Sequence, residues 1–130
     1  MTQILLVDDD PVQLHIRKLV LIGAGFSVSV ATNAEAALAL LRSEPLASDI
    51  SAIVTDHILP GANGAEFVRQ VRDVDPSVPI VVISGLSAAE DEYAGLNIAF
   101  LQKPCPPPEL IALVRSVALA SPGRMVNIPS

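Results

Sequence analysis

The segment Gln-Ile-Leu-Leu-Val-Asp-Asp-Asp-Pro, residues 3–11, decides the fold class of this chain. It begins with a short aliphatic run, which is typical of a strand buried on both faces of a sheet. The run stops at three consecutive aspartates. Asp10 followed by Pro11 indicates a helix start, because aspartate caps free N–H groups and proline fits the first helical position. A buried strand that passes through a polar turn into a helix is the repeating unit of an α/β protein.

The same strand-then-helix unit recurs along the chain. Aliphatic runs predict further strands at residues 26–30, 50–55, 80–83 and 98–101. Helical spacing of apolar residues predicts helices at residues 11–23, 34–42, 66–74, 88–95 and 110–117. Five such units predict an α/β fold with a single five-stranded parallel sheet and helices on both faces, the doubly wound (βα)5 arrangement of flavodoxin-like proteins.

Some local features can be predicted as well. The first helix carries one apolar face, formed by Val12, Ile16, Leu19 and Val20. The second strand alternates valine with serine, which favours a place toward the edge of the sheet. Residues 57–64 contain Pro-Gly and Asn-Gly turn signals and are predicted to be a loop.

Length and composition fit one globular domain. The 130 residues allow a single hydrophobic core, which we expect over residues 1–120, with a flexible C-terminal tail at 121–130. Hydrophobic residues make up 51% and charged residues 17% of the chain, as in folded proteins. The net charge of −6 argues against direct nucleic-acid binding, since phosphate contacts need clustered lysine and arginine.

The sequence also bears on location. Cys105 is the only cysteine, so the chain forms no internal disulfide. No secretory leader opens the chain, and no apolar run is long enough to span a bilayer. We therefore expect a soluble cytoplasmic protein without membrane contact.

Polar side chains gather at the predicted carboxyl ends of the strands, where open parallel sheets form their sites. Asp8 and Asp9 follow the first strand and Asp56 the third, while Ser84 and Lys103 follow the fourth and fifth. Carboxylates in one place repel one another unless a cation lies among them, and oxygen ligands suit Mg²⁺. A lysine and a hydroxyl on the other side would balance a tetrahedral anion. Phosphoryl transfer to a carboxylate, giving an acyl phosphate, needs this arrangement.

Four segments in this order resemble the signature blocks of response-regulator receiver domains, the CheY-like family of two-component signalling. They are ILLVDDDP at 4–11, IVTDHILPGANG at 53–64, VVISG at 81–85 and AFLQKP at 99–104. The resemblance covers roughly residues 2–118, nearly the whole chain. It implies a phosphorylation switch, a protein that catalyses only its own phosphorylation and dephosphorylation and is otherwise not an enzyme.

The resemblance implies a role for each site residue. Asp56 would be the phosphoacceptor, and Mg²⁺ would bind Asp56, Asp9 directly, and Asp8 mainly through water. The backbone carbonyl of Ile58 would complete the protein's share of the metal ligands. Ser84 and Lys103 would hold the phosphoryl oxygens.

The resemblance also implies a switch and partners. Ser84 would move toward the phosphoryl group, and Phe100 would turn into the space that it leaves. The bond between Lys103 and Pro104 matches one that is cis in the family. A histidine kinase or a histidine phosphotransfer protein would supply the phosphoryl group. The downstream protein partner stays open, as does a phosphorylation-dependent dimer.

The sequence departs from the family in places. The interval between Ser84 and Lys103 is short, so the fourth helix is expected to be short. Ile58 and Leu86 occupy the two positions that flank attacking water, and both are apolar, which predicts slow self-dephosphorylation. His57 adjoins the site and is expected to be a surface imidazole.

Other functions are weaker matches to the sequence. A haloacid-dehalogenase-type phosphatase would use Asp8 as nucleophile and Asp10 as acid and base, but it needs an acidic pair after the lysine, and only Glu109 follows Lys103. A pseudo-receiver that binds a partner without phosphorylation conflicts with the retained site residues. A third alternative keeps the chemistry and makes the chain a fragment of a hybrid kinase or a larger regulator.

Overall fold

The computed structural model describes residues 2–43, 50–59, 62–85 and 91–120. Five strands form one parallel sheet in the order β2-β1-β3-β6-β7. Their bounds are β1 Gln3–Val7, β2 Ser27–Ala31, β3 Ile50–Asp56, β6 Ile80–Ser84 and β7 Ala99–Gln102. The predicted fold class is confirmed, and the second strand lies at an edge as expected.

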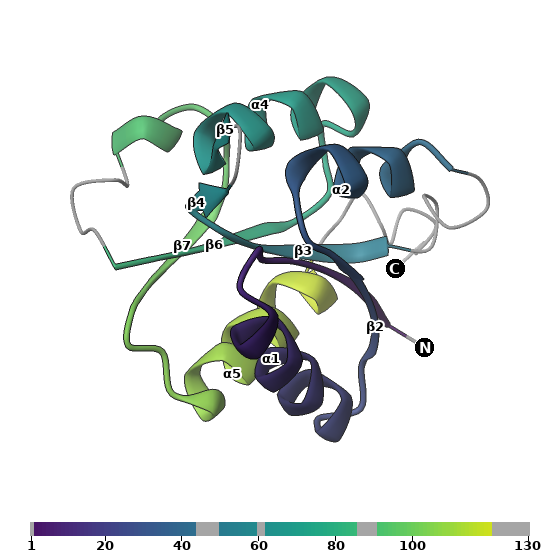
Figure 1. Cartoon of the computed structure of the whole chain (residues 1–130), viewed down its shortest axis with the longest axis vertical. Coiled ribbons are helices and arrows are strands. Elements are labelled where there is room, and N and C mark those ends of the chain that lie inside the picture. Colours follow the sequence, from purple (N-terminus) through teal and green to yellow (C-terminus); the bar gives the residue numbers. More distant parts are fainter. Residues whose placement is uncertain (1, 44–49, 60–61, 86–90, 121–130) are drawn as a thin grey trace.

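Helices cover both faces of this sheet (Figure 1). They are α1 Pro11–Gly23, α2 Ala34–Leu41, α4 Gly64–Val74 and α5 Pro107–Ala120. Helices α1 and α5 lie on one face, and α2 and α4 lie on the other (Figure 1). The predicted cap at Asp10 is confirmed, since its side chain accepts from the backbone N–H groups of Val12 and Gln13. The Asn33 side chain accepts from the N–H of Ala36 in the same way.

The strand β1 explains why there are two cores. Successive side chains of a strand point to opposite faces of the sheet. Ile4 and Leu6 therefore pack against the side of α1 and α5, while Leu5 and Val7 pack against the side of α2 and α4. All four side chains are fully buried, as the uninterrupted aliphatic run predicted.

The predicted apolar face of α1 is largely exposed to solvent and is not packed on the sheet. Val12, Ile16 and Leu19 are more than half exposed, at 64%, 53% and 56%. The buried stripe instead consists of Leu14, Arg17 and Leu21. Arg17 points inward to Asp8, and Leu14 and Leu21, which lie about one helical turn before and after it, face the sheet on the same side of the helix.

The loop predicted at residues 57–64 contains a small antiparallel hairpin. Strand β4, Ile58–Leu59, pairs with β5, Ala62–Asn63. Helix α4 begins at Gly64, two residues before its predicted start at Glu66. In place of the predicted fourth helix, residues 91–93 form one 3-10 turn, while residues 86–90, where that helix was predicted to begin, lie outside the described part.

Two further expectations meet the limits of the described part. The predicted tail at 121–130 lies outside it. No helix within it has both the length and the apolar character needed to cross a membrane.

Candidate functional site at the carboxyl ends of the strands

The strand order places a crevice between β1 and β3. From β1 the chain continues to β2 on one side and then to β3 on the other, and this reversal opens the sheet at the carboxyl ends of β1 and β3. Asp8 follows β1 directly, and Asp56 is the last residue of β3. Among the described residues, the buried polar side chains are Asp8, Arg17, Thr55, Asp56, His57 and Ser84. All but Arg17 lie at the ends of β1, β3 and β6.

Asp56 lies at the edge of this crevice with both carboxylate oxygens in contact. Its Oδ2 is 3.2 Å from Nζ of Lys103, and its Oδ1 accepts from the backbone N–H of His57 at 3.0 Å. The side chain is 10% exposed and that of Lys103 is 32% exposed, so the ion pair borders solvent. An anion that approaches this carboxylate from solvent would also come close to the positive charge of Lys103.

Ser84 and Lys103 come from the neighbouring strands. Ser84 ends β6, the strand beside β3, and its side chain is buried. Its backbone carbonyl accepts from the N–H of Lys103 at 2.8 Å, which ties the ends of β6 and β7 together. The Lys103–Pro104 bond is cis, as the resemblance predicted. The hydroxyl of Ser84 and the ammonium of Lys103 thus lie on adjacent strand ends.

Asp8 is fully buried and is paired with a residue that the sequence did not single out. Its Oδ2 accepts from Nη1 of Arg17 at 2.6 Å, and its Oδ1 accepts from the N–H of Asp10 at 3.0 Å. Arg17 is itself buried and donates from Nη2 to Oε1 of Gln13 at 2.9 Å. Burial raises the pKa of Asp8, although the Asp10 N–H and the charges of Arg17 and Lys103 act in the opposite direction.

The oxygen donors fit Mg²⁺ only in part. Asp9 is exposed beside Asp8. Across the ranges that the structure describes, no three acidic, histidine or cysteine side chains gather into a metal cage. Mg²⁺ needs only one or two carboxylates and keeps several waters, so a site with fewer than three such side chains is compatible with the predicted ligands Asp9, Asp56 and the Ile58 carbonyl. The side chain of Ile58 and all of Leu86, which bear on the predicted slow dephosphorylation, lie outside what the structure describes.

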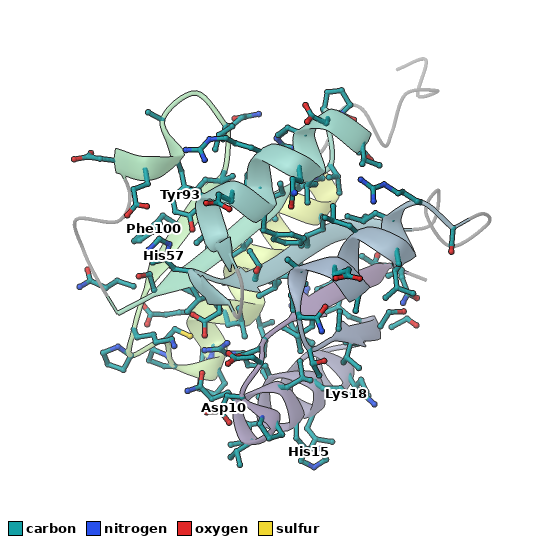
Figure 2. All side chains as sticks on the ribbon, turned by 45° about the horizontal axis from the view of Figure 1, so that its top comes forward. Asp10, His15, Lys18, His57, Tyr93 and Phe100 are labelled. Carbon is teal, nitrogen blue, oxygen red and sulfur yellow. The ribbon has the colours of Figure 1, made fainter. Side chains whose placement is uncertain are left out.

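The other side of Asp56 is lined by aromatic side chains and by His57. The His57 side chain is buried at 5% exposure, so the prediction of a surface imidazole is wrong. Its Nδ1 lies 2.6 Å from the hydroxyl of Tyr93, and its Nε2 is 3.7 Å from a carboxylate oxygen of Glu92. The Tyr93 ring packs beside that of Phe100, with centroids 6.3 Å apart. Figure 2 shows His57, Tyr93 and Phe100 together, well away from Asp10, His15 and Lys18 on α1.

A shallow groove runs from this site along α1. It has a volume of about 270 Å³ and lies between α1 and the beginning of α5. Ile16 and Val20 line one wall, and Lys103 lies at the end that reaches Asp56. Ile16, which is one of the exposed apolar side chains of α1, thus lines the same groove as Lys103.

Sequence analysis missed Arg17, His57 and Tyr93 as parts of the site. A signal for Arg17 was present, because Leu14, Arg17 and Leu21 follow the spacing of one helical stripe. Tyr93 gave no signal, since its partner His57 is 36 residues away along the chain.

Comparison with known proteins agrees with the geometry. The family model "Response regulator receiver domain" matches residues 4–115. The transcriptional regulatory protein SphR for alkaline phosphatase synthesis from Synechococcus elongatus is 33% identical over 99% of this chain and 53% of its own length. The DNA-binding response regulator MtrA from Mycolicibacterium smegmatis is 36% identical over 88% of this chain and 49% of its own length. The chain therefore spans about half the length of these two relatives.

Solved structures share the fold over nearly the whole chain. A CheY-like receiver domain protein from Methanospirillum hungatei superposes with a TM-score of 0.85 at 22% identity, over 95% of this chain and 98% of that one. A response regulator receiver protein from Sinorhizobium medicae superposes with a TM-score of 0.81 at 32% identity, over 92% and 96% of the two chains.

Proposed function

The chain belongs to the response-regulator receiver family, and we propose that it is a phosphorylation switch in which Asp56 accepts a phosphoryl group. One observation carries the proposal: Asp56 ends β3 at the crevice of the sheet, with the ammonium of Lys103 3.2 Å from its carboxylate. The ammonium of Lys103 beside the Asp56 carboxylate, at the border with solvent, would offset the negative charge of an incoming phosphodonor. Bound to this site, a phosphoryl group would lie within reach of Lys103 and Ser84.

The transfer step follows from these groups. A carboxylate oxygen of Asp56 forms a bond to phosphorus while the bond from phosphorus to the donor nitrogen breaks, and its electron pair returns to the donor imidazole. Lys103 offsets negative charge on the phosphoryl oxygens, and the hydroxyl of Ser84 donates to one of them. The N–H of His57, which already donates to Oδ1 of Asp56, keeps the carboxylate oriented.

Mg²⁺ is the proposed cofactor. Asp9, Asp56 and the Ile58 carbonyl would hold it, with Asp8 acting through water. When bound, it would neutralise charge on the phosphoryl group and on the carboxylates. The protein would then catalyse only the formation and loss of its own aspartyl phosphate.

We propose that a histidine kinase or a histidine phosphotransfer protein supplies the phosphoryl group and docks on α1. Val12, Ile16 and Leu19 expose apolar surface there. The groove beside them leads to Lys103 and so to Asp56. A helical phosphodonor could cover this apolar surface while its phosphohistidine reaches Asp56.

The output would be a change in packing. Phe100 is partly buried against the core of the α2 and α4 side, next to Tyr93. Once Ser84 turned to the phosphoryl group, Phe100 would favour an inward position, so phosphorylation would shift the population between two packings. The downstream protein partner and a phosphorylation-dependent dimer would depend on this surface.

The deciding experiment compares the parent with Asp56→Asn in labelling by a small phosphodonor such as phosphoramidate with Mg²⁺. The variant should take up no stable label, because the amide cannot form the acyl phosphate. Label that stays undiminished in the variant would end the proposal. If the parent takes up no label either, the chain is a pseudo-receiver that binds without phosphorylation.

Docking can be separated from chemistry with Ile16→Lys. This residue is exposed, so the variant should fold, and it should label normally from phosphoramidate but slowly from a phosphorylated histidine phosphotransfer protein. Val30→Lys, an exposed apolar position on the edge strand, is the matched control and should label normally from both donors.

A further inference from the structure

The buried ion pair between Asp8 and Arg17 bears on how the proposed site takes up metal. Both oxygens of Asp8 are engaged, one by the guanidinium of Arg17 at 2.6 Å and the other by the N–H of Asp10 at 3.0 Å. The Asp8 side chain has no exposed surface, and that of Arg17 is 10% exposed. Solvent therefore screens this pair little, and the charge of Arg17 acts at close range.

Gln13 holds the guanidinium in this place. It lies one helical turn before Arg17, and its Oε1 accepts from Nη2 while Nη1 donates to Asp8. An arginine presents several donors in a fixed plane and keeps its charge at all ordinary pH values. The guanidinium of Arg17 is thus fixed against one of the carboxylates of the crevice.

Two cations then compete for the same carboxylate. A metal ion beside Asp8 would bind more tightly if the carboxylate were free, and the guanidinium of Arg17 would repel it. In the absence of metal, Arg17 removes the repulsion that Asp8 and Asp56 would otherwise exert on each other.

We propose that Arg17 is an internal competitor of Mg²⁺ at Asp8. It occupies Asp8 in the metal-free protein, lowers the affinity for Mg²⁺, and gives up part of its contact with Asp8 when the metal binds. This inference rests on the proposed function, because it concerns the same metal site.

The first test is calorimetric titration of Mg²⁺ into the parent and into Arg17→Met, which keeps a long side chain without charge. Removing one close positive charge should tighten Mg²⁺ binding by roughly tenfold or more, because solvent screens this charge little. Lys18→Met removes the same charge from the next residue of α1 and should leave the affinity unchanged. Equal affinities of the parent and Arg17→Met would overturn the inference.

A second measurement uses the parent alone, in case Arg17→Met does not fold. Solvent exchange of the Arg17 side-chain N–H protons, followed by NMR, should become faster at saturating Mg²⁺ as the contact with Asp8 loosens. Arg72 is the internal control, since its guanidinium donates to the carbonyls of Leu96 and Val78, and its exchange should not change.

The outcomes separate the two proposals. Mg²⁺ binding with no change in Arg17 exchange would overturn the competition and leave the phosphorylation proposal standing. No Mg²⁺ binding to either protein would overturn the metal site itself.

Discussion

Different kinds of interaction hold together the two sides of Asp56. On the α1 side, a buried aspartate and a buried arginine form an ion pair, and the charged groups continue to Asp9 and Lys103. On the α4 side, His57 and Tyr93 share a hydrogen bond, and Tyr93 packs beside Phe100. Charged side chains would act on a phosphoryl group or a metal ion by electrostatic attraction, without having to move. Packed side chains would transmit a structural change only when their atoms are displaced. Under the proposed function, the first side would govern the chemistry and the second side would govern the output.

The largest effect on stability is expected from Asp8→Ala, which removes the buried ion pair on the α1 side of Asp56. The variant leaves Arg17 buried without its carboxylate, which should lower the free energy of unfolding by about 3–5 kcal/mol. Urea unfolding in EDTA measures this. Asp73→Ala, at an exposed position of α4, is the control and should change stability by less than about 0.5 kcal/mol.

The double variant Asp8→Ala/Arg17→Met sharpens the result. It removes both charges, so it should recover part of the stability that Asp8→Ala loses. A loss below about 1 kcal/mol in the single variant would mean that Arg17 finds another partner, and the charged side would not be a coupled pair.

A smaller effect is expected from Gly64→Ala, which adds a Cβ atom to the closely packed α4 side of Asp56. A Cβ at this position would lie 2.8 Å from the carbonyl oxygen of His57 and would collide with the hydroxyl of Tyr93. Stability should fall by about 1–3 kcal/mol. Tyr93 is the only tyrosine and the chain has no tryptophan, so its fluorescence should report the displacement.

Gly23→Ala is the matched control for this substitution. An added Cβ there meets nothing within 4 Å, and the variant should be as stable as the parent or more so. Unchanged stability and unchanged Tyr93 emission in Gly64→Ala would contradict the close packing of this side.

The smallest effect is expected from Tyr93→Phe, which removes one buried hydrogen bond and should cost about 1 kcal/mol at neutral pH. Burial raises the pKa of Tyr93 above its ordinary value of 10.0, and the nearby Glu92 and Asp56 charges add to this. The folded protein thus keeps a proton that the unfolded chain releases above pH 10, so stability should fall as pH rises past that value.

The pH dependence of the difference between parent and variant is the decisive readout for Tyr93. The stability gap measured by urea unfolding should narrow above pH 10, because Tyr93→Phe lacks this titration. Absorbance at 295 nm of the folded parent should show no tyrosinate near pH 10. A gap that is constant with pH would argue that Tyr93 is not held in its neutral form.

Sequence analysis predicted the sheet and all five of its strands to within one residue at each end, and the family resemblance predicted the cis bond before Pro104. These features depend on residues close together in the chain, namely aliphatic runs, capping aspartate or asparagine, and proline. Sequence analysis did not predict which face of α1 is buried, because the apolar residues of the helix alone could not show that Arg17 would turn inward to Asp8. The burial of His57 was missed for a similar reason, since Tyr93 approaches it from another strand connection.

The amino-acid sequence alone determined that Asp8, Asp9, Asp56, Ser84 and Lys103 would follow the strands of a parallel sheet, because a buried run and the polar residue after it are local in the chain. Only the tertiary structure decided which partner each of them meets. Asp8 is paired with Arg17 and Asp56 with Lys103, since those contacts depend on how far a helix rotates and how two strand ends align. Asp56 and Lys103 are 47 residues apart in the chain, and even the nearby Asp8 and Arg17 meet only because the packing of α1 on the sheet turns Arg17 inward.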